Sequence, residues 1–203
     1  MHCPSACPVR CVRGGPASRP GASDSSVDSS IQLRPADPAD ALRLAALAIQ
    51  VWLHNYATGG VSAPLAHYVL TEFTERKFLA RLARQGAALL VAEVEARLVG
   101  FAAVGFGLPC PADRACSVEL QTLYVQEHFT RQGVGSALLA RSEALGQARA
   151  GSALWLAVNA QNDRARAFYA ARGYRHVADT DFALGGQLHR NLVLLAPVRP
   201  QPG

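Results

Sequence analysis

Two glycines one residue apart, Gly133 and Gly135, stand in the stretch TRQGVGSALL, where an apolar, alanine-rich segment follows them. Glycine lets the backbone approach a ligand closely, and the first N–H groups of a helix carry partial positive charge. Such a turn could wrap a pyrophosphate, with Arg131 as a counter-charge. The amides concerned would be those of Gln132, Gly133, Val134, Gly135, Ser136 and Ala137. The alternative is a glycine turn that serves packing alone.

Two nucleotide-binding signatures are excluded at this turn. A dinucleotide fingerprint of the form G-x-G-x-x-G would need glycine at position 138, where leucine stands. A P-loop would need a Gly-Lys-Ser/Thr sequence, and none follows the glycines. The function of the turn therefore depends on the elements around it.

Those elements are a strand before the turn and a helix after it. The pattern of SVELQTLYV predicts a strand over 117–125, and a helix is expected from Gly135 to about Ala150, ended by Gly151. The nearly continuous apolar run ALWLAVN predicts a strand covered on both faces, and DRARAFYAAR predicts a short helix stopped by Gly173.

The remaining elements complete an α/β order. A short strand is expected in IQLRPAD, and Asp40 is a candidate N-cap for a helix over 41–54. A second helix is predicted from Leu65 to Arg84, and two strands joined by a tight turn near Glu95–Ala96 follow. Two last strands are predicted around YRHVAD and HRNLVLLAPV. The fold class is α/β (α+β), with a mixed, largely antiparallel sheet of six or seven strands flanked by about four helices.

Composition limits the kind of protein. The chain has 203 residues, of which 50% are hydrophobic and 17% charged, as expected of one globular domain with short tails. The boundaries predicted are a disordered Pro/Gly/Ser-rich tail over 1–29, a domain over 30–197 and a tail over 198–203. The net charge of +5 comes almost entirely from arginine, without a dense basic run, so no nucleic-acid partner is expected. No stretch approaches the ~20 apolar residues of a membrane span.

The cysteines indicate a reducing compartment. There are five, an odd number, and no export signal precedes them, which favours the cytoplasm over a disulfide framework. Cys3, Cys7 and Cys11 are evenly spaced but lack a CxxC pair, so no metal site is predicted. Cys110 and Cys116 fall in a loop and are interpreted as incidental thiols.

Three segments in order, ELQTLYV, TRQGVGSALL and VNAQNDRARAFYAARGYR, resemble the GCN5-related N-acetyltransferase (GNAT) superfamily. In that family the G-x-G turn binds the pyrophosphate of acetyl-CoA, which is therefore the expected acyl donor. The third segment matches the family pattern at Asn162, Ala165, Phe168, Tyr169, Gly173 and Tyr174. The resemblance covers roughly residues 31–196 and implies the GNAT fold.

The resemblance assigns roles by position. Leu123 and Val125 would offer backbone groups to the pantetheine arm and the thioester carbonyl, and Asn162 would touch the cofactor's arm. Tyr169 would protonate the leaving thiolate, although a tyrosine packed beside Phe168 is the alternative. The chain departs from the family at Thr130, where Gln or Arg is usual; Arg131 could replace that contact, or the phosphate is held more weakly.

Acetyl transfer also needs a neutral acceptor amine, and a positioned carboxylate can take its proton. Glu119 is the candidate base, with pairing to a cation as its alternative; His128 and His189 are candidates by residue type alone. In this family the acceptor pocket is built mainly from the first two helices. Here that segment holds Trp52, Tyr56, Tyr68, Phe73, Glu72 and Glu75. The aromatic residues suit a pocket or ordinary helix packing. Glu72 and Glu75, expected three residues apart on one helical face, could attract a cationic amine or belong to a solvated acidic face.

We therefore expect a cytoplasmic enzyme that moves acetyl from acetyl-CoA directly to a primary amine of a small molecule. The pattern is similar to the branch that contains polyamine-type acetyltransferases. A protein or peptide N-acetyltransferase and a non-catalytic acyl-CoA-binding module are the alternatives. A loop is expected over 180–188, and it is where a groove for a polypeptide could be narrowed. Because dimers are frequent among similar proteins, a homodimer is one assembly that the resemblance implies.

Overall fold

A single seven-stranded sheet organises the molecule, which we describe from a computed structural model covering residues 31–150, 152–184 and 187–197. The strand order is β1-β2-β3-β4-β5-β7-β6. The strands are β1 (Gln32–Pro35), β2 (Ala87–Val94), β3 (Arg97–Phe106), β4 (Val118–Val125), β5 (Leu154–Asn159), β6 (Arg175–Leu184) and β7 (Gln187–Leu195). Every pair is antiparallel except β4–β5. The predicted fold class is confirmed.

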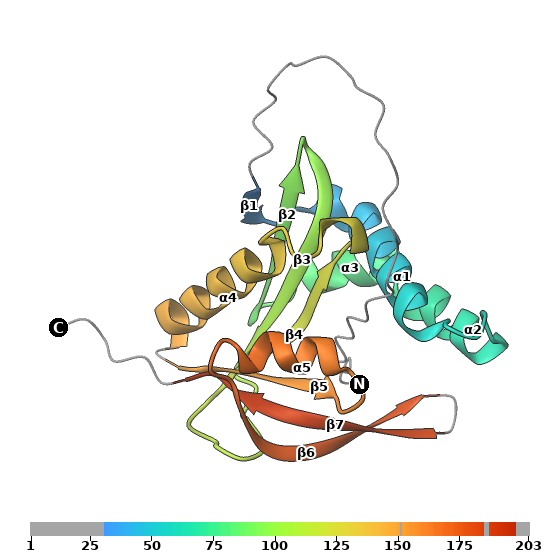
Figure 1. Cartoon of the computed structure of the whole chain (residues 1–203). Helices are drawn as coiled ribbons and strands as arrows, with labels where there is room; N and C mark the ends of the chain where they lie inside the picture. Colours follow the sequence, from blue (N-terminus) through green and yellow to red (C-terminus); the bar gives the residue numbers. More distant parts are fainter. Residues whose placement is uncertain (1–30, 151, 185–186, 198–203) are drawn as a thin grey trace.

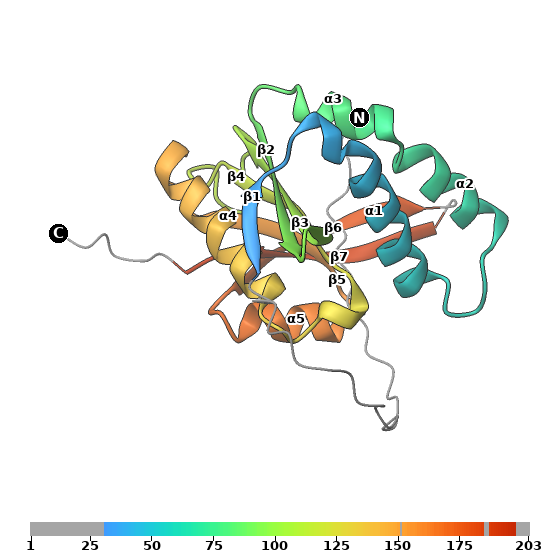
Figure 2. The ribbon, with the colours of Figure 1, turned by 90° about the horizontal axis from the view of Figure 1, so that it is seen from above.

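In the part of the chain that the structure describes, five helices cover the two faces of this sheet (Figures 1 and 2). They are α1 (Ala41–Tyr56), α2 (Ala63–Glu72), α3 (Glu75–Leu82), α4 (Val134–Ala150) and α5 (Asp163–Ala170), with 3-10 turns η1 (Pro38–Asp40) and η2 (Glu127–Phe129). The helices α1 to α3 lie on one face, and α4 lies across the other face against β3 and β4. The predicted tails, the three N-terminal cysteines and Gly151 lie outside the described residues.

The β2–β3 hairpin forms as the sequence predicts. Glu95 and Ala96 both have positive φ, 51° and 59°, which is the backbone of a tight two-residue turn. The strand β5 is buried along its whole length, as its apolar run indicates. Gly173, with φ of 82°, follows α5 and ends it in the left-handed conformation that glycine adopts easily.

The structure corrects three local predictions. Asp40 occupies the N-cap position of α1, but it lies in helical conformation and its side chain makes no capping bond to α1. Asp37 instead caps the preceding turn η1: its carboxylate accepts from the Ala39 amide at 2.8 Å, and the Asp40 carboxylate accepts from the Asp37 amide at 2.9 Å. The helix predicted from Leu65 to Arg84 is two helices, because Thr74 takes an extended backbone and caps α3 through the Lys77 amide.

The third correction concerns the final hairpin. The segment predicted as a loop over 180–188 belongs mostly to strands, since β6 continues to Leu184 and β7 begins at Gln187. The pairing of Phe182 with His189 lies inside this hairpin. Cross-strand pairing therefore extends through most of the segment that was expected to be a loop.

The centre of the sheet opens between its two parallel strands. Among the described residues, β4 and β5 pair only at Val118–Leu154 and Glu119–Trp155. The strand β4 also carries a bulge, because Ala103 faces Thr122 while Val104 faces Leu120, which leaves Gln121 as the extra residue. The second half of β4 thus turns away from β5 and leaves the edge beside Leu123 and Val125 available to a ligand.

Candidate active site

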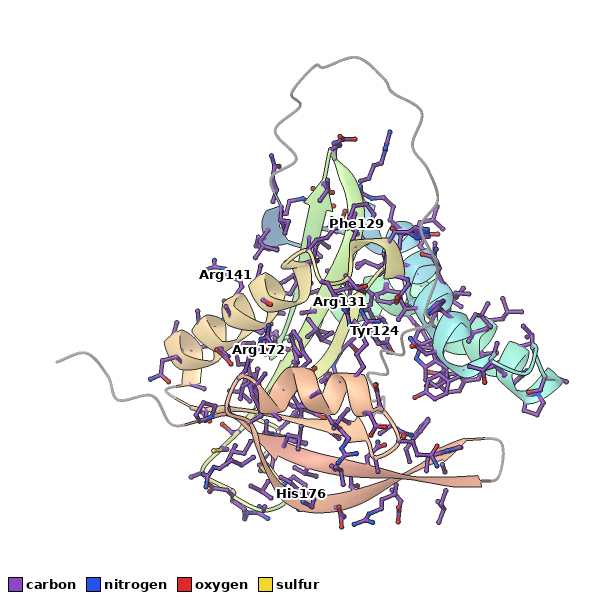
Figure 3. All side chains as sticks on the ribbon, in the orientation of Figure 1. Tyr124, Phe129, Arg131, Arg141, Arg172 and His176 are labelled. Atoms are coloured by element: carbon purple, nitrogen blue, oxygen red, sulfur yellow. The ribbon has the colours of Figure 1, made fainter. Side chains whose placement is uncertain are left out.

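A cavity of about 400 Å³ lies at this opening, between the end of β4, the start of α4 and one side of α5. Its walls are formed by Leu123, Val125, Thr130, Arg131, Gly133, Gly135, Ser136, Arg164, Ala165, Phe168, Tyr169 and Arg172. The strand, the glycine turn and the short helix predicted from sequence therefore meet in one place. Arg131, Arg172 and Tyr124 are labelled in Figure 3.

The glycine turn has the backbone of an anion cradle. Arg131 and Gly133 have positive φ values of 62° and 90°, so the chain reverses tightly before α4. The first amides of a helix have no acceptor within it and point at whatever lies before the helix. The Ala137 amide donates to the Gly133 carbonyl at 2.9 Å, so the amides available for an anion lie before Ala137. The side chain of Val134 is buried in the core.

Gly135 keeps the floor of the cavity clear. A Cβ built on Gly135 would lie 3.6 Å from the Phe168 ring and 3.7 Å from Val125. Any side chain longer than a methyl group would therefore project into the space between these walls. The fit of the turn to a phosphate group thus depends on glycine for shape at position 135 and for backbone conformation at position 133.

Two arginines on α5 and just beyond it join Arg131 at the cavity, and sequence reasoning missed both. The Arg164 side chain pairs with Glu127 at 3.2 Å, while Arg172 stacks its guanidinium over the Phe168 ring, 3.7 Å from the centroid. Arg164, Phe168 and Arg172 recur every four residues and share one helical face. This spacing within the family pattern is the sequence signal from which the two arginines could have been predicted to lie at the cavity.

Tyr169 packs beside Phe168 and also lines the cavity, and its role as a proton donor stays a prediction. Its ring is 1% exposed and packs edge-to-face on Phe168, with 5.1 Å between centroids. The same side chain lines the cavity beside Leu123. Packing on Phe168 therefore fixes the ring at the wall of the cavity, where a proton donor would be needed.

Other predicted cofactor contacts are occupied within the protein. The Asn162 Oδ1 accepts from the Ala165 amide at 3.1 Å and caps α5, and Asn162 does not line the cavity. The Gln132 side chain donates to the His128 carbonyl at 2.6 Å. The Thr130 hydroxyl donates to the Glu127 carbonyl at 2.8 Å. The side chains of Thr130 and Gln132 thus shape the turn, which leaves backbone groups to face the cavity.

Glu119 lies where the two parallel strands separate. It is 6% exposed, pairs across the sheet with Trp155, and accepts from Gln121 Nε2 at 3.3 Å. It precedes Leu123 by four residues along β4 and does not line the cavity of 400 Å³. Its role as a base stays a prediction.

A second, smaller cavity of about 140 Å³ reaches the same stretch of β4 from the side of α1. It shares Leu123 and Val125 with the larger cavity and is otherwise lined by Gln50, Val51, His54, Asn55, Gln126, Glu127 and His128. His54 Nε2 lies 3.6 Å from the Glu127 carboxylate. The edge of β4 is therefore approached by hollows from both faces of the sheet.

The predicted acceptor-pocket residues are mostly packed together. Trp52 is buried, donates from Nε1 to the Tyr124 hydroxyl at 2.7 Å, and contacts the rings of Tyr56 and Tyr68, with centroids 4.2 and 4.4 Å away. Glu72 accepts from Lys77 Nζ at 2.7 Å. Glu72 and Glu75 do not share a helical face, because Glu72 ends α2 and Glu75 begins α3.

The two cysteines and His189 do not line the larger cavity. Cys110 and Cys116 are free and buried, and burial raises the pKa of the Cys116 thiol, which disfavours the nucleophilic thiolate. His189 lies on the final hairpin opposite Phe182. Among the described residues, no group of three or more His, Cys, Asp or Glu side chains could hold a metal ion. No described helix is long and apolar enough to span a membrane.

Comparison with known proteins agrees with this geometry. The family model described as "Acetyltransferase (GNAT) family" matches residues 52–174. An uncharacterized N-acetyltransferase of Mycobacterium tuberculosis strain H37Rv is 28% identical over 156 residues, which cover 77% of this chain and 96% of the relative.

Two solved structures share the fold. The PaiA N-acetyltransferase of Thermoplasma acidophilum, solved with coenzyme A, has a TM-score of 0.65 and 23% identity over 80% of this chain and 98% of its own. The ribosomal-protein-alanine N-acetyltransferase of Brucella melitensis has a TM-score of 0.62 and 23% identity over 82% of this chain and 99% of its own. The chain belongs to the acetyltransferase (GNAT) family and is an N-acetyltransferase that uses acetyl-CoA as its acyl donor.

Proposed function

We propose that the chain transfers acetyl directly from acetyl-CoA to the primary amine of a small molecule, with both substrates bound together. The amine nitrogen attacks the thioester carbonyl carbon, a C–N bond forms, and the C–S bond breaks to release CoA. Glu119 takes the proton that the amine loses, and Tyr169 gives a proton to the leaving sulfur. The hollows on both faces of the β4 edge support this arrangement, because each substrate has its own approach to Leu123 and Val125.

One contact favours a small-molecule acceptor over a polypeptide. Phe182 on the β6–β7 hairpin meets Tyr68 on α2 edge-on, with 6.3 Å between ring centroids. This contact joins the hairpin to α2 across the α1–α2 face of the sheet. A polypeptide acceptor would need an open groove between these two elements, whereas a small amine does not.

The test measures release of free thiol from acetyl-CoA with spermidine, with phenethylamine and with short peptides that carry a free N-terminus. We expect kcat/KM for at least one small amine to exceed that for every peptide by tenfold or more. Preferential use of the peptides would contradict the small-molecule assignment. CoA binding without turnover of any amine would favour a non-catalytic module.

Removal of the ring that closes the face should weaken this preference. In Phe182→Ala the hairpin loses its contact with Tyr68, so we expect peptide acetylation to rise relative to small-amine acetylation by about threefold or more. Leu188→Ala is the matched control, because Leu188 lies on the same hairpin and is 72% exposed. An unchanged ratio in Phe182→Ala would show that the hairpin does not select the acceptor.

A further inference from the structure

The loss of the usual Gln or Arg at position 130 raises the question of which group supplies positive charge to the phosphates. The Thr130 side chain is uncharged and its hydroxyl already donates to the Glu127 carbonyl. Of the three arginines at the cavity, Arg164 is paired with the Glu127 carboxylate at 3.2 Å. Its charge is therefore largely neutralised before a ligand arrives, which leaves Arg131 and Arg172.

Arg172 is held rigidly at the start of α4. Its Nη2 donates to the Ser136 hydroxyl at 2.5 Å, and its Nη1 donates to the Phe168 carbonyl at 2.7 Å. The guanidinium plane also stacks on the Phe168 ring, 3.7 Å from its centroid. A guanidinium has five N–H donors, so these two bonds leave others available for a phosphate oxygen.

Neither of these hydrogen bonds neutralises the positive charge of Arg172. Both acceptors of Arg172, a hydroxyl and a carbonyl, are neutral, in contrast to the carboxylate that Arg164 meets. The Ser136 hydroxyl accepts from Arg172 and so keeps its own proton free to donate. Because Ser136 belongs to the first turn of α4, the Arg172 guanidinium lies beside the backbone amides of that turn, which are the groups that could bind an anion.

We propose that Arg172, which reaches the glycine turn from the end of α5, binds the pyrophosphate of CoA. It would take the place of the Gln or Arg that is usual at position 130. The proposal rests on CoA occupying the larger cavity. Arg131 contributes less, because it is exposed on the turn and an exposed charge is screened by solvent and salt. A cation fixed before binding also loses less conformational freedom on binding. Arg131 and Arg172 are both labelled in Figure 3, where Arg172 lies between the ribbons of α4 and α5.

The test compares the dissociation constants of CoA and of 3′-dephospho-CoA by calorimetry in wild type, Arg172→Gln and Arg131→Gln. The two ligands share the pyrophosphate and differ in the 3′-phosphate. We expect Arg172→Gln to weaken both ligands by the same factor, about tenfold or more, because a charge-assisted hydrogen bond is lost. Arg131→Gln should cost less, and the salt dependence of CoA binding should be shallower in Arg172→Gln.

Two further variants separate binding from folding. Arg172→Lys keeps the charge without the planar stacking, so it should bind CoA with an affinity between those of wild type and Arg172→Gln. Arg166→Gln is the matched control, since Arg166 lies on α5, six residues before Arg172, but pairs with Asp163 at 2.9 Å. Ser136→Ala should weaken CoA binding in the wild type and add little in the Arg172→Gln background, because the two groups act as a unit.

The outcomes are distinct. If Arg172→Gln lowered the affinity for CoA but not that for 3′-dephospho-CoA, the proposal would be overturned, since Arg172 would then bind the 3′-phosphate. Equal effects of Arg172→Gln and Arg166→Gln, or a loss of affinity that only follows a loss of unfolding free energy, would also overturn it. If Arg172→Gln does not fold, the same comparison in Arg172→Lys decides. Failure of the wild type to bind either ligand would instead refute the CoA site itself.

Discussion

At the scale of single residues, Tyr169 is buried and yet belongs to the wall of the cavity. Burial against Phe168 and Tyr174 restricts its ring to one orientation, with centroids 5.1 and 5.4 Å away. A fixed hydroxyl can give a proton to a leaving group without first losing side-chain entropy. The proposed role of Tyr169 as a general acid would use this property.

The corresponding prediction concerns Tyr169→Phe, which keeps the ring and removes the hydroxyl. We expect kcat to fall by about a hundredfold, because general acid catalysis contributes on this order, while the dissociation constant of CoA stays within about twofold. Tyr174→Phe is the control: its hydroxyl donates to Glu143 at 2.9 Å, away from the cavity. A kcat within twofold of wild type for Tyr169→Phe would leave the ring with a packing role only.

At the scale of elements, the site depends on how β4 ends and how α4 begins. The bulge at Gln121 and the early separation from β5 open the edge of β4, and the turn with Gly133 at φ of 90° aims the start of α4 at that opening. A strand that stayed paired to β5 would close the cavity, and a turn without glycine would be strained. The arrangement of the two elements, more than any one side chain, makes the cradle.

Gly135→Glu tests this arrangement because it fills the cradle and adds negative charge. Acetyl-CoA at a hundred times its dissociation constant should stabilise wild type by about 2.7 kcal/mol, seen as a rise in Tm of roughly 5 to 10 °C. We expect Gly135→Glu to abolish this rise. The control is Gly59→Glu, since a Cβ at Gly59 meets nothing within 4 Å. A ligand-induced rise that survives in Gly135→Glu would defeat the cradle assignment.

At the scale of the whole molecule, a partly buried ion network ties the start of the domain to the sheet. Asp40 is fully buried and accepts from Arg34 at 2.7 Å and also from Arg43, while Arg34 bonds Glu93 on β2 at 2.8 Å. The Arg34 hydrogen bond holds the pKa of Asp40 well below its usual range. The charged form of Asp40 is therefore the form that stabilises the fold.

Asp40→Ala should lower the free energy of unfolding by about 2 to 3 kcal/mol near neutral pH, because Arg34 and Arg43 lose their buried partner. Asp37→Ala, the control, should cost about 1 kcal/mol as a lost cap. A lowered folded pKa means that the stabilisation is present above about pH 4, the ordinary pKa of Asp, and is lost below it. The gap between wild type and Asp40→Ala in urea denaturation should therefore close as the pH falls; a gap independent of pH would contradict this.

Sequence alone determined the elements that depend on neighbouring residues. The apolar run of β5, the turn at Glu95–Ala96 and the helix after Gly133 follow from local periodicity and turn chemistry, and the family pattern places Tyr169 at the site. Tertiary structure decided what depends on distant contacts. Examples are the bond from Arg172 to Ser136, across 36 positions of the chain, and the recruitment of Asp40 by Arg34 and Arg43. Local patterns carry no record of such contacts, because these residues become neighbours only when the sheet and its helices pack together.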